Sequence, residues 1–98
     1  MYGLIGKFLA VPGQRDALMA IMLEDVGELP GCRGFVVAAD TADENALWIT
    51  EVWDSEESHK ASLAIPAVRE SIERAMPLIA GFAEQIVTRP VGGIGLLG

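Results

Sequence analysis

The chain has 98 residues, of which 51% are hydrophobic, and a formal net charge of −7. Its 14 acidic residues outnumber 7 basic ones that form no cluster, so we expect no binding to nucleic acids or anionic membrane surfaces. No apolar run approaches the roughly 20 residues of a membrane-spanning helix, and the length predicts a single domain, residues 1–98.

Cysteine content and the N-terminal segment bear on location. Cys32 is the only cysteine, so no intrachain disulfide can form, and no cysteine or histidine pair has metal-ligand spacing. The N-terminal segment contains a lysine and no small-residue cleavage site, unlike a signal peptide. We therefore expect a cytoplasmic protein without a metal, in which Cys32 is a buried, unreactive thiol.

Two kinds of hydrophobic spacing alternate along the chain. Runs rich in apolar and β-branched residues alternate with runs in which apolar residues recur every three or four positions, as on one face of a helix. The order β-α-β-β-α-α-β predicts a ferredoxin-like α+β fold, an antiparallel sheet with helices on one face. The predicted elements are strands at 2–10, 32–40, 46–53 and 82–88, a helix at 14–28, a short helix ending near 64, a helix beginning at Pro66, and a glycine-rich tail at 91–98.

Specific residue types mark the expected helix ends. Asp54 is the predicted N-cap of the short helix, with Glu57 three residues later in the capping-box position. Pro66 suits the first position of the next helix. Pro77 should kink or end that helix, and Gly81 is its candidate C-cap.

The strand at 46–53 is largely apolar on both faces. Alternation along it places two sets of side chains on opposite faces, Leu47, Ile49, Glu51 and Trp53 against Ala46, Trp48, Thr50 and Val52. Helices can cover only one face, which we take to be the Trp53 face. We expect the other face to pack against the same sheet of a second copy, giving a homodimer with Trp48 in its interior.

Three side chains near the end of this strand are candidates for chemistry. Trp53 offers a flat apolar wall and one N–H donor for a planar aromatic substrate, although packing alone would also explain it. Glu51 shares its face, and if buried it is either a structural hydrogen-bond partner or a general base with a raised pKa. His59, in the short helix, could point toward the sheet or lie at the edge near Glu56.

Several segments, in this order, resemble the antibiotic biosynthesis monooxygenase (ABM) domain over about residues 2–95: PGQRDAL, PGCRGFVVAAD, EVWDSEESHKASL, PAVRESIERAMPLIAGF and TRPVGG. The resemblance implies a dimeric α+β barrel of ferredoxin-like subunits. Characterised members oxidise polycyclic phenols, anthrones or quinols with O₂ and use no metal, flavin or haem. The pocket tryptophan of the family falls on Trp53, in a Glu-x-Trp pattern that begins at Glu51.

Other members of this family degrade haem with a histidine in the helix after the same strand. That position falls near Ser62 or Leu63, whereas His59, the only histidine, lies one helical turn earlier. We therefore expect haem to bind weakly or not at all, and the resemblance implies that the protein uses no cofactor.

The resemblance predicts a cofactor-independent monooxygenase that uses a small aromatic substrate and O₂. The predicted site residues are Trp53, Glu51 and His59 for catalysis, and Phe35, Ile49, Leu63 and Arg69 for substrate binding. Arg69 would reach the pocket rim from the Ile72 side of its helix, unless it is exposed to solvent. Two alternatives stay open, a dimeric module that only binds a small apolar ligand and an isomerase or lyase on the same barrel.

Overall fold

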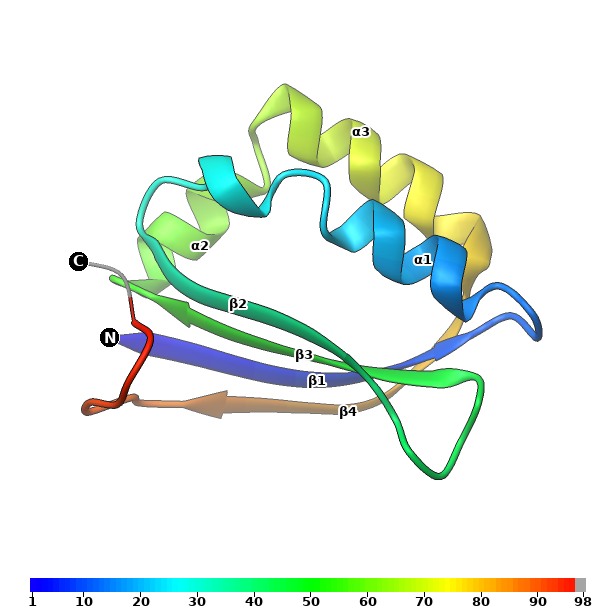
Figure 1. Ribbon diagram of the computed structural model, residues 1–98. Helices are drawn as coiled ribbons and strands as arrows, with labels where there is room; N and C mark the ends of the chain where they lie inside the picture. Colours follow the sequence, from blue (N-terminus) through cyan, green and yellow to red (C-terminus); the bar gives the residue numbers. More distant parts are fainter. Residues whose placement is uncertain (97–98) are drawn as a thin grey trace.

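The computed structural model describes residues 1–96, in which helices cover one face of a four-stranded antiparallel sheet (Figure 1). The elements are β1 (Tyr2–Ala10), α1 (Arg15–Met22), η1 (Val26–Glu28), β2 (Cys32–Ala39), β3 (Ala46–Trp53), α2 (Glu56–Ser62), α3 (Pro66–Ala75), η2 (Met76–Leu78) and β4 (Ile79–Thr88). Within the described residues, no helix is long and apolar enough to cross a membrane.

The strand order is β2-β3-β1-β4, and each neighbouring pair is antiparallel. This order confirms the predicted ferredoxin-like fold, because the first and third strands lie at the centre and the second and fourth at the edges. The predicted bounds of β1 and β3 match the structure, and that of β2 differs by one residue.

The register of the central strands determines which side chains face the helices. Leu4 pairs with Glu51, and Gly6 pairs with Ile49. Leu47 and Ile49 pack in one buried cluster with Leu18 of α1 and Ala75 of α3. The alternation predicted for β3 is therefore confirmed, and the Glu51 and Trp53 face of the sheet lies under the helices.

The helix expected at 14–28 is shorter in the structure. It ends at Met22, and a turn separates it from the 3₁₀ turn η1. Asp25 and Gly27 are poor helix formers, and α3 holds the turn through side-chain contacts. The Ser71 hydroxyl donates to Asp25 Oδ2 at 2.8 Å, and Arg74 forms an ion pair with Glu24.

The N-cap of α2 is Ser55 and not Asp54. The Ser55 Oγ accepts a hydrogen bond from the Ser58 backbone N–H at 3.1 Å. Asp54 instead pairs its carboxylate with Arg33 of β2, and its backbone N–H donates to the Gly31 carbonyl at 2.8 Å. The prediction was wrong because a neighbouring strand supplied a cation that engages the Asp54 carboxylate.

The end of α3 also differs from expectation. Pro66 occupies the first turn as predicted, and the helix gives way to the 3₁₀ turn that contains Pro77. Gly81 is not a C-cap, because β4 already begins at Ile79 and places Gly81 opposite Leu9 of β1. The 3₁₀ turn that contains Pro77 therefore ends the helix, and Gly81 lies further along the chain in β4.

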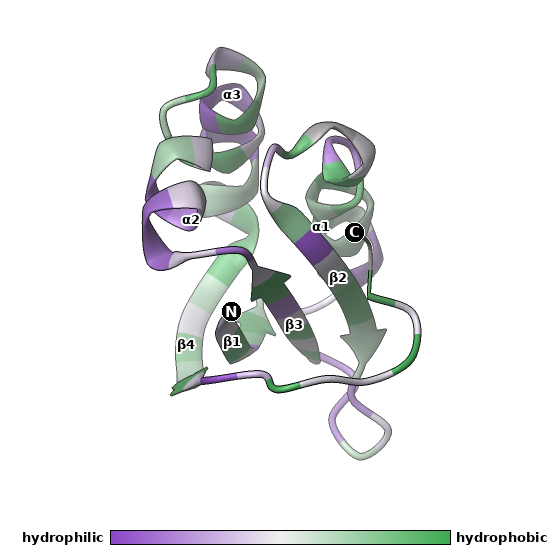
Figure 2. Ribbon diagram, turned by 90° about the vertical axis from the view of Figure 1, so that its left-hand side faces the viewer, coloured by the Kyte–Doolittle hydropathy of each residue, from purple (hydrophilic) through white to green (hydrophobic). Residues whose placement is uncertain are grey.

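The face of the sheet opposite the helices carries exposed apolar side chains. Val36 of β2 is 59% exposed and Ile86 of β4 is 47% exposed. Figure 2 shows the residues after β4 crossing from its end toward β2, where Leu96 packs against Gly34. Of the predicted tail at 91–98, residues 91–96 form no helix or strand, and 97 and 98 lie outside the described residues.

A polar cluster interrupts this apolar face at Trp48. Its indole Nε1–H donates to Asp40 Oδ2 at 2.9 Å, and Lys7 lies over its ring at 5.6 Å from the centroid. The Trp48 hydrogen bond is the largest of the effects that lower the pKa of Asp40 from 3.8 to about 2, ahead of the backbone N–H groups of Ala42 and Asp43.

We predict that Trp48→Phe raises the Asp40 pKa from about 2 toward 3.8 without reaching it, because the two backbone donors remain. Since the folded pKa is depressed, the stability linked to this group is present above pH 3.8 and is lost as the pH falls toward 2. An NMR titration of the side-chain carboxyl carbon measures the shift, with Trp53→Phe as control. An unchanged pKa in Trp48→Phe would contradict the assignment.

Candidate functional site

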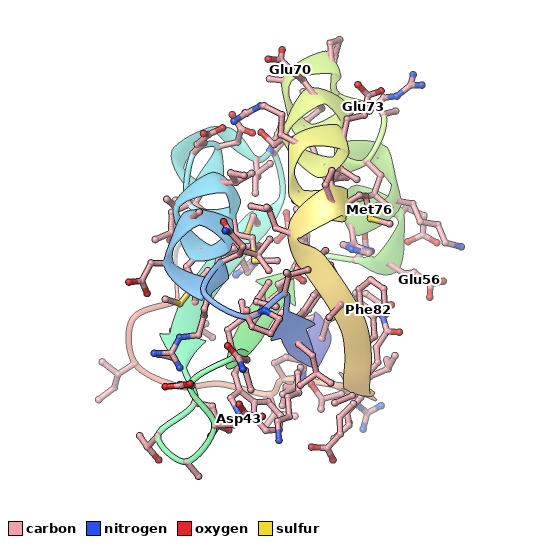
Figure 3. All side chains as sticks on the ribbon, turned by 90° about the vertical axis from the view of Figure 1, so that its right-hand side faces the viewer. Asp43, Glu56, Glu70, Glu73, Met76 and Phe82 are labelled. Atoms are coloured by element: carbon pink, nitrogen blue, oxygen red, sulfur yellow. The ribbon has the colours of Figure 1, made fainter. Side chains whose placement is uncertain are left out.

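A cavity of about 290 Å³ lies between the sheet and the helices. Most of its wall is apolar, with Phe35 and Trp53 on the sheet side and Val68 and Ile72 of α3 on the helix side. Figure 3 shows Met76 and Phe82 on one side of the molecule, where α3 leads into β4. Both line the cavity and are more than half exposed, at 52% and 63%, so the cavity opens there.

Trp53 and Glu51 meet in the wall of this cavity. Trp53, at the end of β3, is 1% exposed, and its indole Nε1–H donates to Glu51 Oε1 at 3.0 Å. The two residues are two positions apart and therefore project from the same face of the strand. This hydrogen bond holds the Glu51 carboxylate beside the indole, so the two defining residues of the Glu-x-Trp pattern contact each other directly.

His59 points toward the sheet and not toward Glu56. Its ring lies 5.4 Å from the Trp53 ring in an edge-on arrangement and 5.8 Å from the Tyr2 ring, measured between centroids. Glu56 instead pairs with Lys60. His59 therefore lies beside Glu51 and Trp53. Of the two orientations that the sequence left open, the ring adopts the one that points toward the sheet.

The environment of Glu51 favours its protonated form. Burial raises the pKa of the carboxyl above its usual 4.5, while the Trp53 N–H and the charge of His59 lower it in part. A carboxyl group with a raised pKa can accept a proton near neutral pH more readily than an exposed glutamate can. The arrangement thus places a carboxyl group with a raised pKa beside an aromatic wall.

The loop before β2 holds α2 in place. Gly31 has a positive φ of 83°, and a Cβ there would lie 2.7 Å from the Ser58 side chain. Only glycine permits both the conformation and this close approach. Since Ser58 precedes His59, the contact fixes the start of α2 and with it the height of the imidazole above the sheet.

The other predicted site residues fall in three different places. Phe35 and Leu63, predicted to bind substrate, both line the cavity, and Leu63 is 45% exposed. Ile49 is buried and lines a second, adjoining cavity of about 380 Å³. Arg69 is exposed and is not among the lining residues of either cavity, because it follows Val68 on α3 and lies beside the inward face.

Sequence reasoning missed several residues of the site. Phe8 and Phe82 line both cavities, and their rings pack edge to face with 5.1 Å between the centroids. Asp25 and Ser71 form a polar contact at the helix side of the first cavity. Tyr2 could have been found from the pairing of strands, because it lies opposite Trp53 in the register of β1 and β3.

Two polar positions near the site have no evident catalytic geometry. Burial raises the pKa of the half-buried Cys32 thiol, whose S–H donates to the Gly34 carbonyl. Ser62, near the position of the histidine in haem-degrading members, is buried and donates to the His59 carbonyl at 2.6 Å. In the described part of the chain, no three His, Cys, Asp or Glu side chains could hold a metal ion.

Comparison with known proteins shows that the chain matches one family model and that a solved structure is closely similar to it. Residues 1–74 match the family model for antibiotic biosynthesis monooxygenase. A crystal structure from Chloroflexus aurantiacus J-10-fl that bears the name of this family is 58% identical, covers 97% of both chains and has a TM-score of 0.94. No match is found among curated proteins.

More distant structures share the fold alone. One from Deinococcus radiodurans, also bearing the family name, is 20% identical over 100% of both chains with a TM-score of 0.77. A conserved protein from Methanosarcina mazei Go1 is 16% identical over 90% of both chains with a TM-score of 0.78.

We predict that Glu51→Gln changes the pH dependence of stability. Because the folded pKa of Glu51 is raised, its contribution is fully present below pH 4.5 and is lost as the pH rises through the folded pKa. Glutamine has no such loss, so the free energy of unfolding of the variant should rise relative to that of the native protein as the pH increases above 4.5. Urea unfolding at several pH values measures this, with Glu57→Gln on exposed α2 surface as control. Parallel curves would contradict the raised pKa.

Proposed function

Because the chain belongs to the antibiotic biosynthesis monooxygenase family, we propose that it oxidises a planar phenolic compound, a quinol or an anthrone, with O₂ and without a cofactor. One observation carries the proposal. A carboxyl group with a raised pKa, Glu51, is held by the Trp53 indole in the wall of an apolar cavity. Family membership supports the proposed reaction class, and the position of the carboxyl group supports its proposed role in removing a proton.

The proposed reaction begins with the substrate ring lying against Trp53, with Phe35 and Leu63 as further walls. Glu51 removes a proton from the phenol or from the methylene carbon of an anthrone. The anion of an anthrone transfers one electron to O₂, the two radicals combine into a carbon-bound peroxide, and this peroxide takes up the proton held by Glu51 and loses water to leave the quinone. A quinol instead gives two electrons and two protons to O₂, which leaves the quinone and hydrogen peroxide. The apolar wall excludes bulk water from the anion.

A positioned base contributes about 10² to 10⁴ in rate, which corresponds to roughly 3 to 5 kcal/mol of barrier lowering. Glu51 is the first choice for this role because its carboxylate has one oxygen bound to the Trp53 N–H and a pKa raised by burial. His59, which faces the same indole, is the second candidate.

The proposed assembly is a homodimer in which two sheets pack face to face and close the α+β barrel. Exposed Val36 and Ile86 on the open face support it, because a small protein gains by burying such side chains against a partner. The single half-buried cysteine is compatible with the proposed cytoplasmic location.

For activity, we predict that Glu51→Gln lowers the rate of O₂ uptake with hydroquinones and anthrones by about 100-fold or more. The amide still accepts the Trp53 N–H, so the fold should persist. His59→Gln, which removes the second candidate base, is the matched comparison, and Trp48→Phe on the opposite face is the control. Equal rates in Glu51→Gln and the native protein would exclude Glu51 as the base.

The same assay separates the two alternative functions. Consumption of O₂ with formation of the quinone supports oxidation. Conversion of the substrate without O₂ uptake would indicate an isomerase or lyase, and tight binding without conversion would indicate a ligand-binding module.

For assembly, we predict that the protein sediments at about twice its chain mass and that Trp48→Glu dissociates or unfolds it, because a charge would enter a buried interface. Analytical ultracentrifugation at micromolar concentration measures both. Ala17→Glu, which adds the same charge on the exposed side of α1, should leave the dimer intact. A well-folded monomeric native protein would contradict the face-to-face assembly.

A further inference from the structure

We propose that the two adjoining cavities form one site with two compartments, which selects an uncharged ligand. A planar ring system would occupy the first compartment, and a short arm ending in a hydroxyl or another hydrogen-bond donor would enter the second. This inference rests on the proposed function for the location of the ring, and it adds the class of substituent that the substrate carries.

The two compartments share a partition. Phe8, Phe82, Glu51 and His59 line both cavities. The two phenylalanines pack edge to face and form its apolar half. Glu51 and His59 form its polar half, so a ligand that spans the partition passes directly beside the carboxyl group.

Gly6 lies on the floor of the second compartment. Gly6 has no positive φ, so the backbone there does not require glycine. A Cβ at this position would approach the Phe8 ring to 3.0 Å and the Glu84 carbonyl oxygen to 3.8 Å. The missing side chain therefore lets the Phe8 ring lie close to the sheet beside the compartment, with the Glu84 carbonyl near the same floor.

The polar groups of the second compartment accept hydrogen bonds. They include the Glu51 carboxylate and the Glu84 carbonyl, and Gln85 lies opposite Gly6 on the same face of the sheet. A hydroxyl group on the ligand could donate to any of these oxygens. One oxygen of Glu51 already accepts from Trp53, so the other is the natural acceptor for the arm.

Neither cavity offers an anionic substituent a lysine or an arginine. Among the described residues that line the two cavities, Asp25 and Glu51 are acidic, and His59 is the one side chain that can carry a positive charge. That charge already acts on the Glu51 carboxyl group. Arg69, the cation expected at the rim, is exposed and lies outside both linings. A ligand carboxylate would lose its hydration beside Glu51 and would compete with it for the single imidazole, which is unfavourable.

The first test compares two anthraquinone-diols that differ in one substituent, a hydroxymethyl group or a carboxylate. Quinones are already oxidised, so binding is measured without turnover, by calorimetry or tryptophan fluorescence at neutral pH. We expect the hydroxymethyl compound to bind at least about tenfold more tightly, and Glu51→Gln to narrow this ratio. Equal or tighter binding of the carboxylate would overturn the inference.

The second test fills the compartment. Gly6→Val should weaken binding of the hydroxymethyl compound at least about tenfold more than binding of the anthraquinone-diol without an arm, because the new side chain enters the second compartment and reaches the first only by displacing Phe8. Ala17→Val, which adds the same two carbons on exposed α1, is the control. If Gly6→Val does not fold, Gly6→Ala should shift binding in the same direction by less. Equal weakening of both ligands, or of neither, would overturn the second compartment.

These outcomes are independent of the proposed oxidation. If the quinones bind as expected but the corresponding quinols and anthrones consume no O₂, the proposed function fails and the ligand class stands. If O₂ is consumed equally well with neutral and carboxylated substrates, the oxidation stands and the selection for uncharged ligands fails.

Discussion

The hydrogen bond from the Trp53 indole to the Glu51 carboxylate is the interaction on which the candidate site depends. It joins a nearly fully buried ring to an ionisable group that burial alone would disfavour. Without the indole N–H, the carboxylate would lose the hydrogen bond that most opposes the effect of burial on its pKa. The packing of Trp53 and its contact with Glu51 are therefore not separable, because the same side chain forms the wall of the cavity and orients the carboxylate.

The sheet makes this arrangement possible through the pairing of β1 with β3. The register places Tyr2 opposite Trp53 and Leu4 opposite Glu51. Residues at the start of the chain are therefore the neighbours of Trp53 and Glu51 on β1. From the other side, Gly31 lets the loop approach α2 closely and thereby positions His59. Three segments that are distant in sequence thus converge on one carboxylate, and each is fixed by backbone geometry.

Much of this could be predicted from the sequence, because a strand has a strict period of two. The alternation of Leu47, Ile49, Glu51 and Trp53 correctly gave the face that lies under the helices. The ferredoxin-like fold followed from the order of the elements, and the observed strand order agrees with it.

The wrong predictions concern two kinds of position. In one, two neighbouring residues suit the same role; in the other, the outcome depends on a contact with a segment distant in sequence. Asp54 and Ser55 can both cap a helix, and Arg33 on another strand decides between them. Arg69 is one position away from an inward-facing valine, and spacing alone could not exclude it from the rim. The partition of Phe8 and Phe82 depends on an irregular stretch in the pairing of β1 with β4, which leaves no local signal in either strand.

The position of Tyr2 has a practical consequence for handling the protein. Its ring lies against His59, while Met1 before it is exposed. A purification tag fused ahead of Met1 would therefore join the chain one residue before Tyr2. There it would lie close enough to the His59 imidazole to crowd the side chains around it.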